Sequence, residues 1–109
     1  MIHDKVHFDI EVERIRQEKL KAEGKFLFTC ADKIEDPIRL AILAEEFGEV
    51  AKEVTEGIIF YDKVLQGKNK QTRNEFETAN RKKIRTELIQ VAAVCVAWAE
   101  ALDREIEDG

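Results

Sequence analysis

Five glutamates occupy one short segment at spacings that place their carboxylates on one side of a helix. They are Glu45, Glu46, Glu49, Glu53 and Glu56. At about 100° per residue, all of them fall within an arc of roughly 100° on a helical wheel. Lys52 is the only basic residue near this arc, so the repulsion between the glutamates is largely uncompensated. Such clustered carboxylates suit Mg²⁺, which takes oxygen ligands; a solvated acidic face is the alternative interpretation.

A second polar pair lies in a segment that is otherwise apolar. Glu87 and Gln90 stand about one helical turn apart beside a stripe of leucine, isoleucine, valine and alanine. Polar groups at the edge of a buried stripe need partners, because burying them without hydrogen bonds costs free energy. Glu87 therefore either faces the glutamate row and completes a metal site, or pairs with Arg81 or Arg85.

Three helices are expected to position these residues. The first spans about residues 5–23, the second residues 36–67 and the third residues 75–107. The second helix has a clear start, because Asp36 is a favourable N-cap and Pro37 suits the first helical position. Its interior contains no residue that breaks a helix strongly.

The glycines of the second helix, the segment that follows it and the third helix indicate how the helices pack. Gly48 and Gly57 lie inside the second helix, where each marks a close helix contact or a kink, and residues 68–74 are polar enough for a loop. The third helix carries an apolar stripe comprising Ile84, Leu88, Val91, Ala92, Cys95, Trp98, Ala99, Leu102 and Ile106, with further apolar residues outside it. A helix that is apolar nearly all round is buried on more than one side. The sequence thus predicts an all-α bundle of long antiparallel helices, completed by oligomerisation.

The composition favours a single all-α domain spanning residues 1–109. Five glycines and one proline are too few for a turn-rich β protein, and a net charge of −5 argues against duplex nucleic acid as a partner. The spacing of the two cysteines fits neither a disulfide framework nor a metal site. The longest apolar run, residues 91–99, is far shorter than the roughly 20 residues that a membrane span requires. We therefore expect a cytoplasmic protein with no membrane partner.

The order of these segments resembles a known family. The segment EEFGE at residues 45–49 is similar to the EExxE motif of the MazG-like, all-α nucleoside triphosphate pyrophosphohydrolases. The segment ELIQ at residues 87–90 occupies the place of that family's ExxD motif, and the apolar run after it resembles the third helix of phage- and prophage-type members. In the first helix, ERIRQ at residues 13–17 resembles an ERxRQ-type segment of the same subgroup.

The resemblance implies a Mg²⁺-dependent hydrolase, with Mn²⁺ as a substitute. Its reaction is the cleavage of a ribo- or deoxyribonucleoside triphosphate into the monophosphate and pyrophosphate, and its role is the removal of unwanted nucleotides by a homodimer or homotetramer. By the same resemblance Glu45, Glu46, Glu49 and Glu87 bind the metal, and one of these carboxylates positions or deprotonates the attacking water.

Two features depart from the family pattern: one residue of the second motif, and the interval from Glu49 to Glu87, which is longer than the family usually has. Gln90 stands where the family has Asp, and its neutral amide oxygen can bind Mg²⁺ but cannot act as a base. The alternative function is therefore a catalytically degenerate relative that binds a nucleotide or a protein partner without turnover. A purely structural coiled dimer is a third interpretation.

Basic and aromatic residues near the motifs are candidates for binding the substrate. Arg81 and Lys83 suit the β- and γ-phosphates. The first helix offers Arg16, Gln17 and Lys19 for contacts to the base or the phosphates. Solvated surface is the alternative for both groups. Phe26 and Phe28 lie in the loop after the first helix, where a ring can stack on a base, whereas Trp98 is expected in the core or in a subunit interface.

Overall fold

The computed structural model describes residues 4–109, and within them it contains helices and no strand. The elements are α1 (Asp4–Ala22), α2 (Asp36–Phe60), the π-helical turn η1 (Tyr61–Leu65) and α3 (Lys70–Asp108). The predicted all-α class is confirmed.

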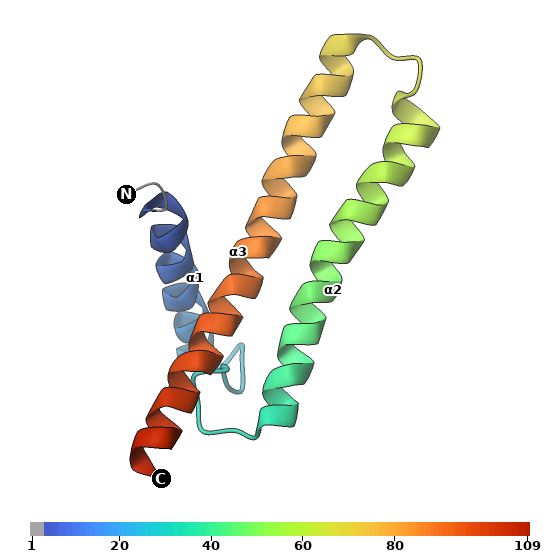
Figure 1. The fold of residues 1–109 in the computed structure, drawn as a ribbon. Helices are drawn as coiled ribbons and strands as arrows, with labels where there is room; N and C mark the ends of the chain where they lie inside the picture. Colours follow the sequence, from blue (N-terminus) through green and yellow to red (C-terminus); the bar gives the residue numbers. More distant parts are fainter. Residues whose placement is uncertain (1–3) are drawn as a thin grey trace.

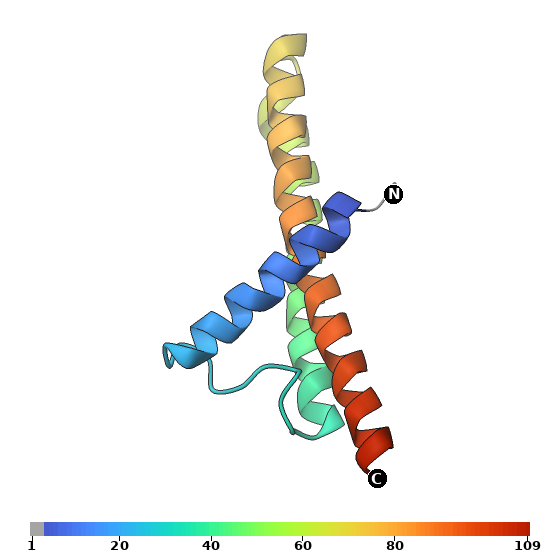
Figure 2. The ribbon, with the colours of Figure 1, turned by 90° about the vertical axis from the view of Figure 1, so that its left-hand side faces the viewer.

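Helices α2 and α3 form a long antiparallel hairpin, and α1 crosses it (Figure 1). Viewed from the side, α1 lies steeply across α3 near the middle of the hairpin (Figure 2), and α1 packs on α3. The molecule is elongated, with extents of 60 × 32 × 26 Å. The end of the hairpin that carries η1 therefore projects beyond α1.

Helix α2 begins at Asp36, but this residue is not its N-cap. Glu35 is the N-cap and makes no side-chain capping hydrogen bond, while Asp36 is already helical. The Asp36 carboxylate instead accepts hydrogen bonds from Trp98 Nε1 (2.9 Å) and from Arg39 (3.0 Å). The predicted N-cap role of Asp36 is thus wrong, because a partner on α3 takes its side chain.

Helix α3 begins five residues before the predicted position, so most of the expected loop at residues 68–74 is helical. The cause is an N-cap that the sequence analysis missed: Asn69 Oδ1 accepts a hydrogen bond from the backbone amide of Thr72 at 2.8 Å. Gly67, with φ +88°, adopts the left-handed conformation in the turn before this helix.

The two glycines inside α2 differ in role. A Cβ added to Gly57 would lie 2.7 Å from Asn80 Oδ1, so Gly57 allows α3 to approach closely, as predicted. A Cβ added to Gly48 would meet nothing within 4 Å, so no contact explains this glycine.

The buried core is small and lies at the base of the hairpin. Its centre consists of Cys30, Val94 and Ala97, and Ile42, Leu43 and Trp98 pack against it. Arg39 is only 1% exposed and forms salt bridges with Asp36 and with Glu105 on α3. This arginine therefore ties the start of α2 to the end of α3. Within residues 4–109, no helix is long and apolar enough to cross a membrane.

Candidate functional site

Glutamates from all three helices influence one another where α1 crosses the hairpin. This carboxylate cluster comprises Glu13 from α1, Glu45, Glu46, Glu49 and Glu53 from α2, and Glu87 from α3. Burial raises the pKa of Glu46 above its ordinary value, and the negative charge of Glu87 raises it further. Within the glutamate row of α2, Glu46 and Glu53 are half-buried, whereas Glu45 and Glu49 are exposed. Glu56, at the end of the row, is exposed and is not among the residues that raise these pKa values.

Glu87 lies in an environment that disfavours its charged form. Loss of solvent raises its pKa, and the charges of Glu49, Glu53 and Glu13 raise it further. Its Oε2 atom is buried and has no hydrogen-bond partner. Arg85, one of the alternative partners, instead donates to Asp9 at 2.7 Å. A buried carboxylate oxygen among other carboxylates is an acceptor that a cation would satisfy.

Glu13 is a member that the sequence analysis missed. It is 7% exposed, and its carboxylate accepts hydrogen bonds from Arg16 Nε (2.6 Å) and Arg16 Nη2 (2.8 Å). The amide of Gln17 lies 3.4 Å from the same carboxylate. The signal was present in the sequence, because Glu13 opens the ERIRQ segment with Arg16 and Gln17 one helical turn later.

The predicted substrate-binding residues lie on two helices: Arg16, Gln17 and Lys19 on α1, and Arg81 and Lys83 on α3. Arg16 lies beside the cluster: its hydrogen bond to Glu13 raises its pKa, and the charge of Glu46 adds to this effect. Lys19 is far more exposed, and its ammonium group lies 4.0 Å from Glu23. Arg81 and Lys83 are exposed on α3, between one and two turns before Glu87.

A pocket of about 330 Å³ adjoins the cluster. It is lined by Gln17, Lys25, Phe26, Leu27, Phe28, Thr29, Cys30, Ile42, Glu45, Glu46 and Val94. One wall is thus the aromatic loop after α1, and another carries two carboxylates of the cluster. Apolar walls with a few charged groups are typical of a site that binds a small molecule. Gln90 is half-buried on α3, one turn beyond Glu87.

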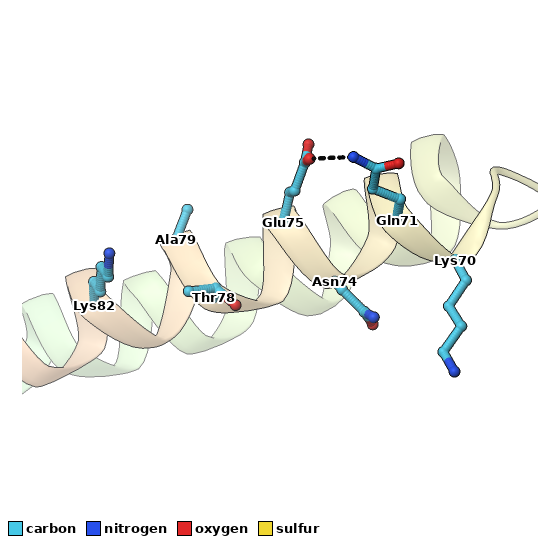
Figure 3. Close-up of a pocket in the computed structure, with 7 residues that line it drawn as sticks. All are labelled: Lys70, Gln71, Asn74, Glu75, Thr78, Ala79 and Lys82. Carbon is cyan, nitrogen blue, oxygen red and sulfur yellow. Dashed lines mark hydrogen bonds between the residues drawn. The ribbon is translucent and has the colours of Figure 1, made fainter.

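A larger hollow of about 740 Å³ lies along the first half of α3. Figure 3 shows that its seven lining residues all come from this one helix and that their side chains spread in different directions. Gln71 donates to Glu75 across it at 3.2 Å. Because a single helix cannot surround a ligand, this surface is a weaker candidate than the pocket beside the cluster.

The carboxylates share one electrostatic environment but do not converge on a point. Among residues 4–109, no three His, Cys, Asp or Glu side chains are already arranged to hold one metal ion. Comparisons of the chain with protein-family models, curated proteins and solved structures found no match.

Proposed function

We propose that this protein is a Mg²⁺-dependent nucleoside triphosphate pyrophosphohydrolase of the MazG-like type. The reaction is hydrolysis of the α–β phosphoanhydride bond, which yields a nucleoside monophosphate and pyrophosphate. The observation that supports it best is Glu87, whose buried Oε2 has no partner and whose neighbours are glutamates from the other two helices. Such an arrangement costs stability in the free protein, and a bound cation would offset that cost.

The metal ligands of this proposal are Glu45, Glu46, Glu49 and Glu87, with Gln90 as a further neutral ligand. These residues would hold Mg²⁺, or Mn²⁺ in its place, and the ion would supply the charge neutralisation at the phosphate oxygens that phosphoryl-type transfer requires. One of the carboxylates positions or deprotonates the attacking water.

Three observations support a nucleotide as the substrate. Arg16 lies beside the cluster, where its planar guanidinium suits a phosphate group. Phe26 and Phe28 line the pocket next to Glu45 and Glu46, where an aromatic ring can stack on a base. The volume of that pocket, about 330 Å³, lies within the range of small-molecule sites.

The proposed role is the removal of unwanted nucleotides from the cytoplasmic pool by a homodimer or homotetramer. Oligomerisation is favoured because a single chain leaves many large apolar side chains in water, Phe47 at 63% exposure and Ile58 at 59% among them. Arg81 and Lys83 are the proposed contacts to the β- and γ-phosphates.

Gln90 favours a second candidate function, a catalytically degenerate relative that binds a nucleotide without hydrolysing it. Its amide cannot supply the negative charge or the base that the family's Asp supplies. This alternative predicts Mg²⁺-dependent nucleotide binding without turnover. It also predicts that Gln90→Asp creates or increases hydrolysis.

The test is pyrophosphate release from a panel of standard and modified nucleoside triphosphates, with and without Mg²⁺. Glu49→Gln removes one ligand, while Glu77→Gln makes the same chemical change at an exposed position of α3. We expect Mg²⁺-dependent release that Glu49→Gln abolishes and Glu77→Gln preserves. Release that survives Glu49→Gln would point to a contaminating enzyme and remove the basis of the proposal.

A further inference from the structure

Among the side chains that line the pocket beside the carboxylate cluster, Gln17 offers an amide oxygen without a partner. Gln17 is a half-buried residue of α1, and its amide nitrogen donates to Glu13 Oε2 at 3.4 Å. Glu13 does not line this pocket, so the nitrogen is turned away from it. Within residues 4–109, no group donates a hydrogen bond to the amide oxygen. The oxygen is therefore free to accept one from a ligand.

The orientation of the Gln17 amide is fixed by two neighbours on α1. Glu13 is 7% exposed, and its carboxylate accepts hydrogen bonds from Arg16 Nε at 2.6 Å and from Arg16 Nη2 at 2.8 Å. A carboxylate held in this way offers only acceptor atoms. The amide nitrogen of Gln17 is the donor that matches it, whereas a flipped amide would set oxygen against oxygen. Arg16 and Glu13 thus keep the amide oxygen of Gln17 available to the pocket.

The other polar side chains of the pocket are already engaged. Thr29 is 6% exposed, and its Oγ1 donates to Glu18 at 2.8 Å. The side chain of Lys25 is 66% exposed, and its ammonium group lies 3.4 Å from Glu23. The two carboxylates of the pocket are the proposed metal ligands. Gln17 is therefore the neutral polar group best placed to contact an uncharged part of a ligand.

We propose that Gln17 selects nucleotides whose base is cytosine or adenine. This inference rests on the proposed function, which places the base of the substrate in this pocket against Phe26 and Phe28. Cytosine and adenine present an amino N–H donor where uracil and hypoxanthine present a carbonyl oxygen. The amino group satisfies the amide oxygen of Gln17, whereas the carbonyl would face it as a second acceptor.

The half-burial of Gln17 sets the size of the preference. A site that hydrogen-bonds one substrate group disfavours an analogue that leaves the site's own polar atom unpaired. Because water can reach a half-buried amide and replace part of the bond, we expect a preference of about tenfold rather than the much larger factors of an enclosed site.

Two matched pairs of nucleotides test the inference without any substitution in the protein. CTP and UTP differ only at the edge of the base that carries the amino group or the carbonyl, and so do ATP and ITP. Steady-state hydrolysis with Mg²⁺ should favour the amino member of each pair by about tenfold in kcat/KM. Equal values for both members, in a protein that hydrolyses them, would overturn the inference and leave the proposed function intact.

Binding separates the inference from catalysis. Isothermal titration calorimetry with the α,β-imido analogues of CTP and UTP measures the Kd of each nucleotide without hydrolysis of the α–β bond. A Kd about tenfold lower for the CTP analogue, in a protein that hydrolyses no nucleotide, would support the inference although the proposed hydrolase fails. Equal Kd values, or no binding of either analogue, would overturn the inference.

Substitutions assign the preference to Gln17. Gln17→Met removes the amide and nearly keeps the length of the side chain, so the preference within each pair should fall to about twofold or less. Gln71→Met makes the same change at an exposed position of α3 outside the pocket and should keep the wild-type preference. Glu13→Gln should also reduce the preference, because an amide at this position lets the Gln17 amide turn over. A Gln17→Met protein that still prefers the amino bases tenfold would overturn the inference.

Discussion

Replacing Glu87 with glutamine should stabilise the protein when no divalent cation is present. The wild-type carboxylate has one buried oxygen without a donor, and it is repelled by Glu49, Glu53 and Glu13. Glutamine keeps the shape of the side chain and removes its charge. An enzyme that holds repelling carboxylates together for a metal gives up stability in the metal-free state, and this substitution should recover it.

The size of the effect follows from the burial of Glu87. A buried acceptor without a donor costs about 1–3 kcal/mol, and each nearby like charge adds a few tenths. Because Glu87 as a whole is only half-buried, solvent screening reduces these costs, and we expect a net gain of about 1 kcal/mol. For a chain of this size, that gain corresponds to a rise in Tm of roughly 4 °C.

Thermal unfolding followed by circular dichroism, at one protein concentration and in EDTA, measures the difference in Tm between the wild type and Glu87→Gln. The folded state raises the pKa of Glu87 above the ordinary 4.5, so the folded protein binds a proton more readily than the unfolded chain. Lowering the pH from 7 through the raised pKa therefore relieves the penalty in the wild type. The advantage of Glu87→Gln should be largest at pH 7 and should shrink as the pH approaches 4.5.

Saturating Mg²⁺ should make the wild type more stable than Glu87→Gln. A ligand at 100 times its Kd stabilises the native state that binds it by about 2.7 kcal/mol. Glu77→Gln, an exposed change on the same helix, should show neither effect. A Glu87→Gln protein that is no more stable than the wild type in EDTA would refute the description of this carboxylate as strained.

Four other substitutions test the remaining parts of the structure. Gly48→Ala should stabilise the protein by up to about 1 kcal/mol in urea unfolding, whereas Gly57→Ala should not, because its Cβ would displace the side chain of Asn80 and so offset the same gain. Equal effects would contradict the contact between Gly57 and Asn80. Arg39→Met should cost about 1–2 kcal/mol, because it removes the hydrogen bonds to Glu105 and Asp36 while both carboxylates stay partly in solvent. An unchanged midpoint would show that this arginine does not hold the two helix ends together. If Arg16 binds phosphate, Arg16→Gln should raise the KM for nucleotide more than it lowers kcat, as measured by steady-state kinetics. Lys19→Gln, an exposed change on the same helix, is the control that separates this role from a general loss of positive charge.

The glutamate row was predictable from sequence because its geometry is local. Spacings of three and four residues within one helix fix which side chains share a face, whatever the helix packs against. The predicted apolar stripe of α3 is not its buried side: Leu88, Cys95 and Ile106 are exposed, and the buried residues of this helix are Ala93, Val94, Ala97 and Ala101. This expectation was wrong because periodicity does not show which side of a helix that is apolar nearly all round the other helices cover.

The parts that the sequence analysis missed depend on contacts between helices. Glu13 joins the cluster only because α1 crosses the hairpin at that level, and no spacing within α1 determines the crossing. Asp36 satisfies the pattern of an N-cap, yet its carboxylate binds Trp98 on α3 and Arg39 one turn further along α2. Arg39 itself shows no sign of burial in the sequence, since its partner Glu105 is 66 residues away.

The most direct test of the proposed enzyme is the identity of its products. Purified protein is incubated with Mg²⁺ and the best nucleoside triphosphate of the panel, and the reaction is resolved by anion-exchange chromatography. The proposal predicts equal amounts of nucleoside monophosphate and pyrophosphate, formed only with the divalent cation and not by Glu49→Gln. Nucleoside diphosphate with orthophosphate, or no hydrolysis of any nucleotide by a protein that binds Mg²⁺, would contradict it.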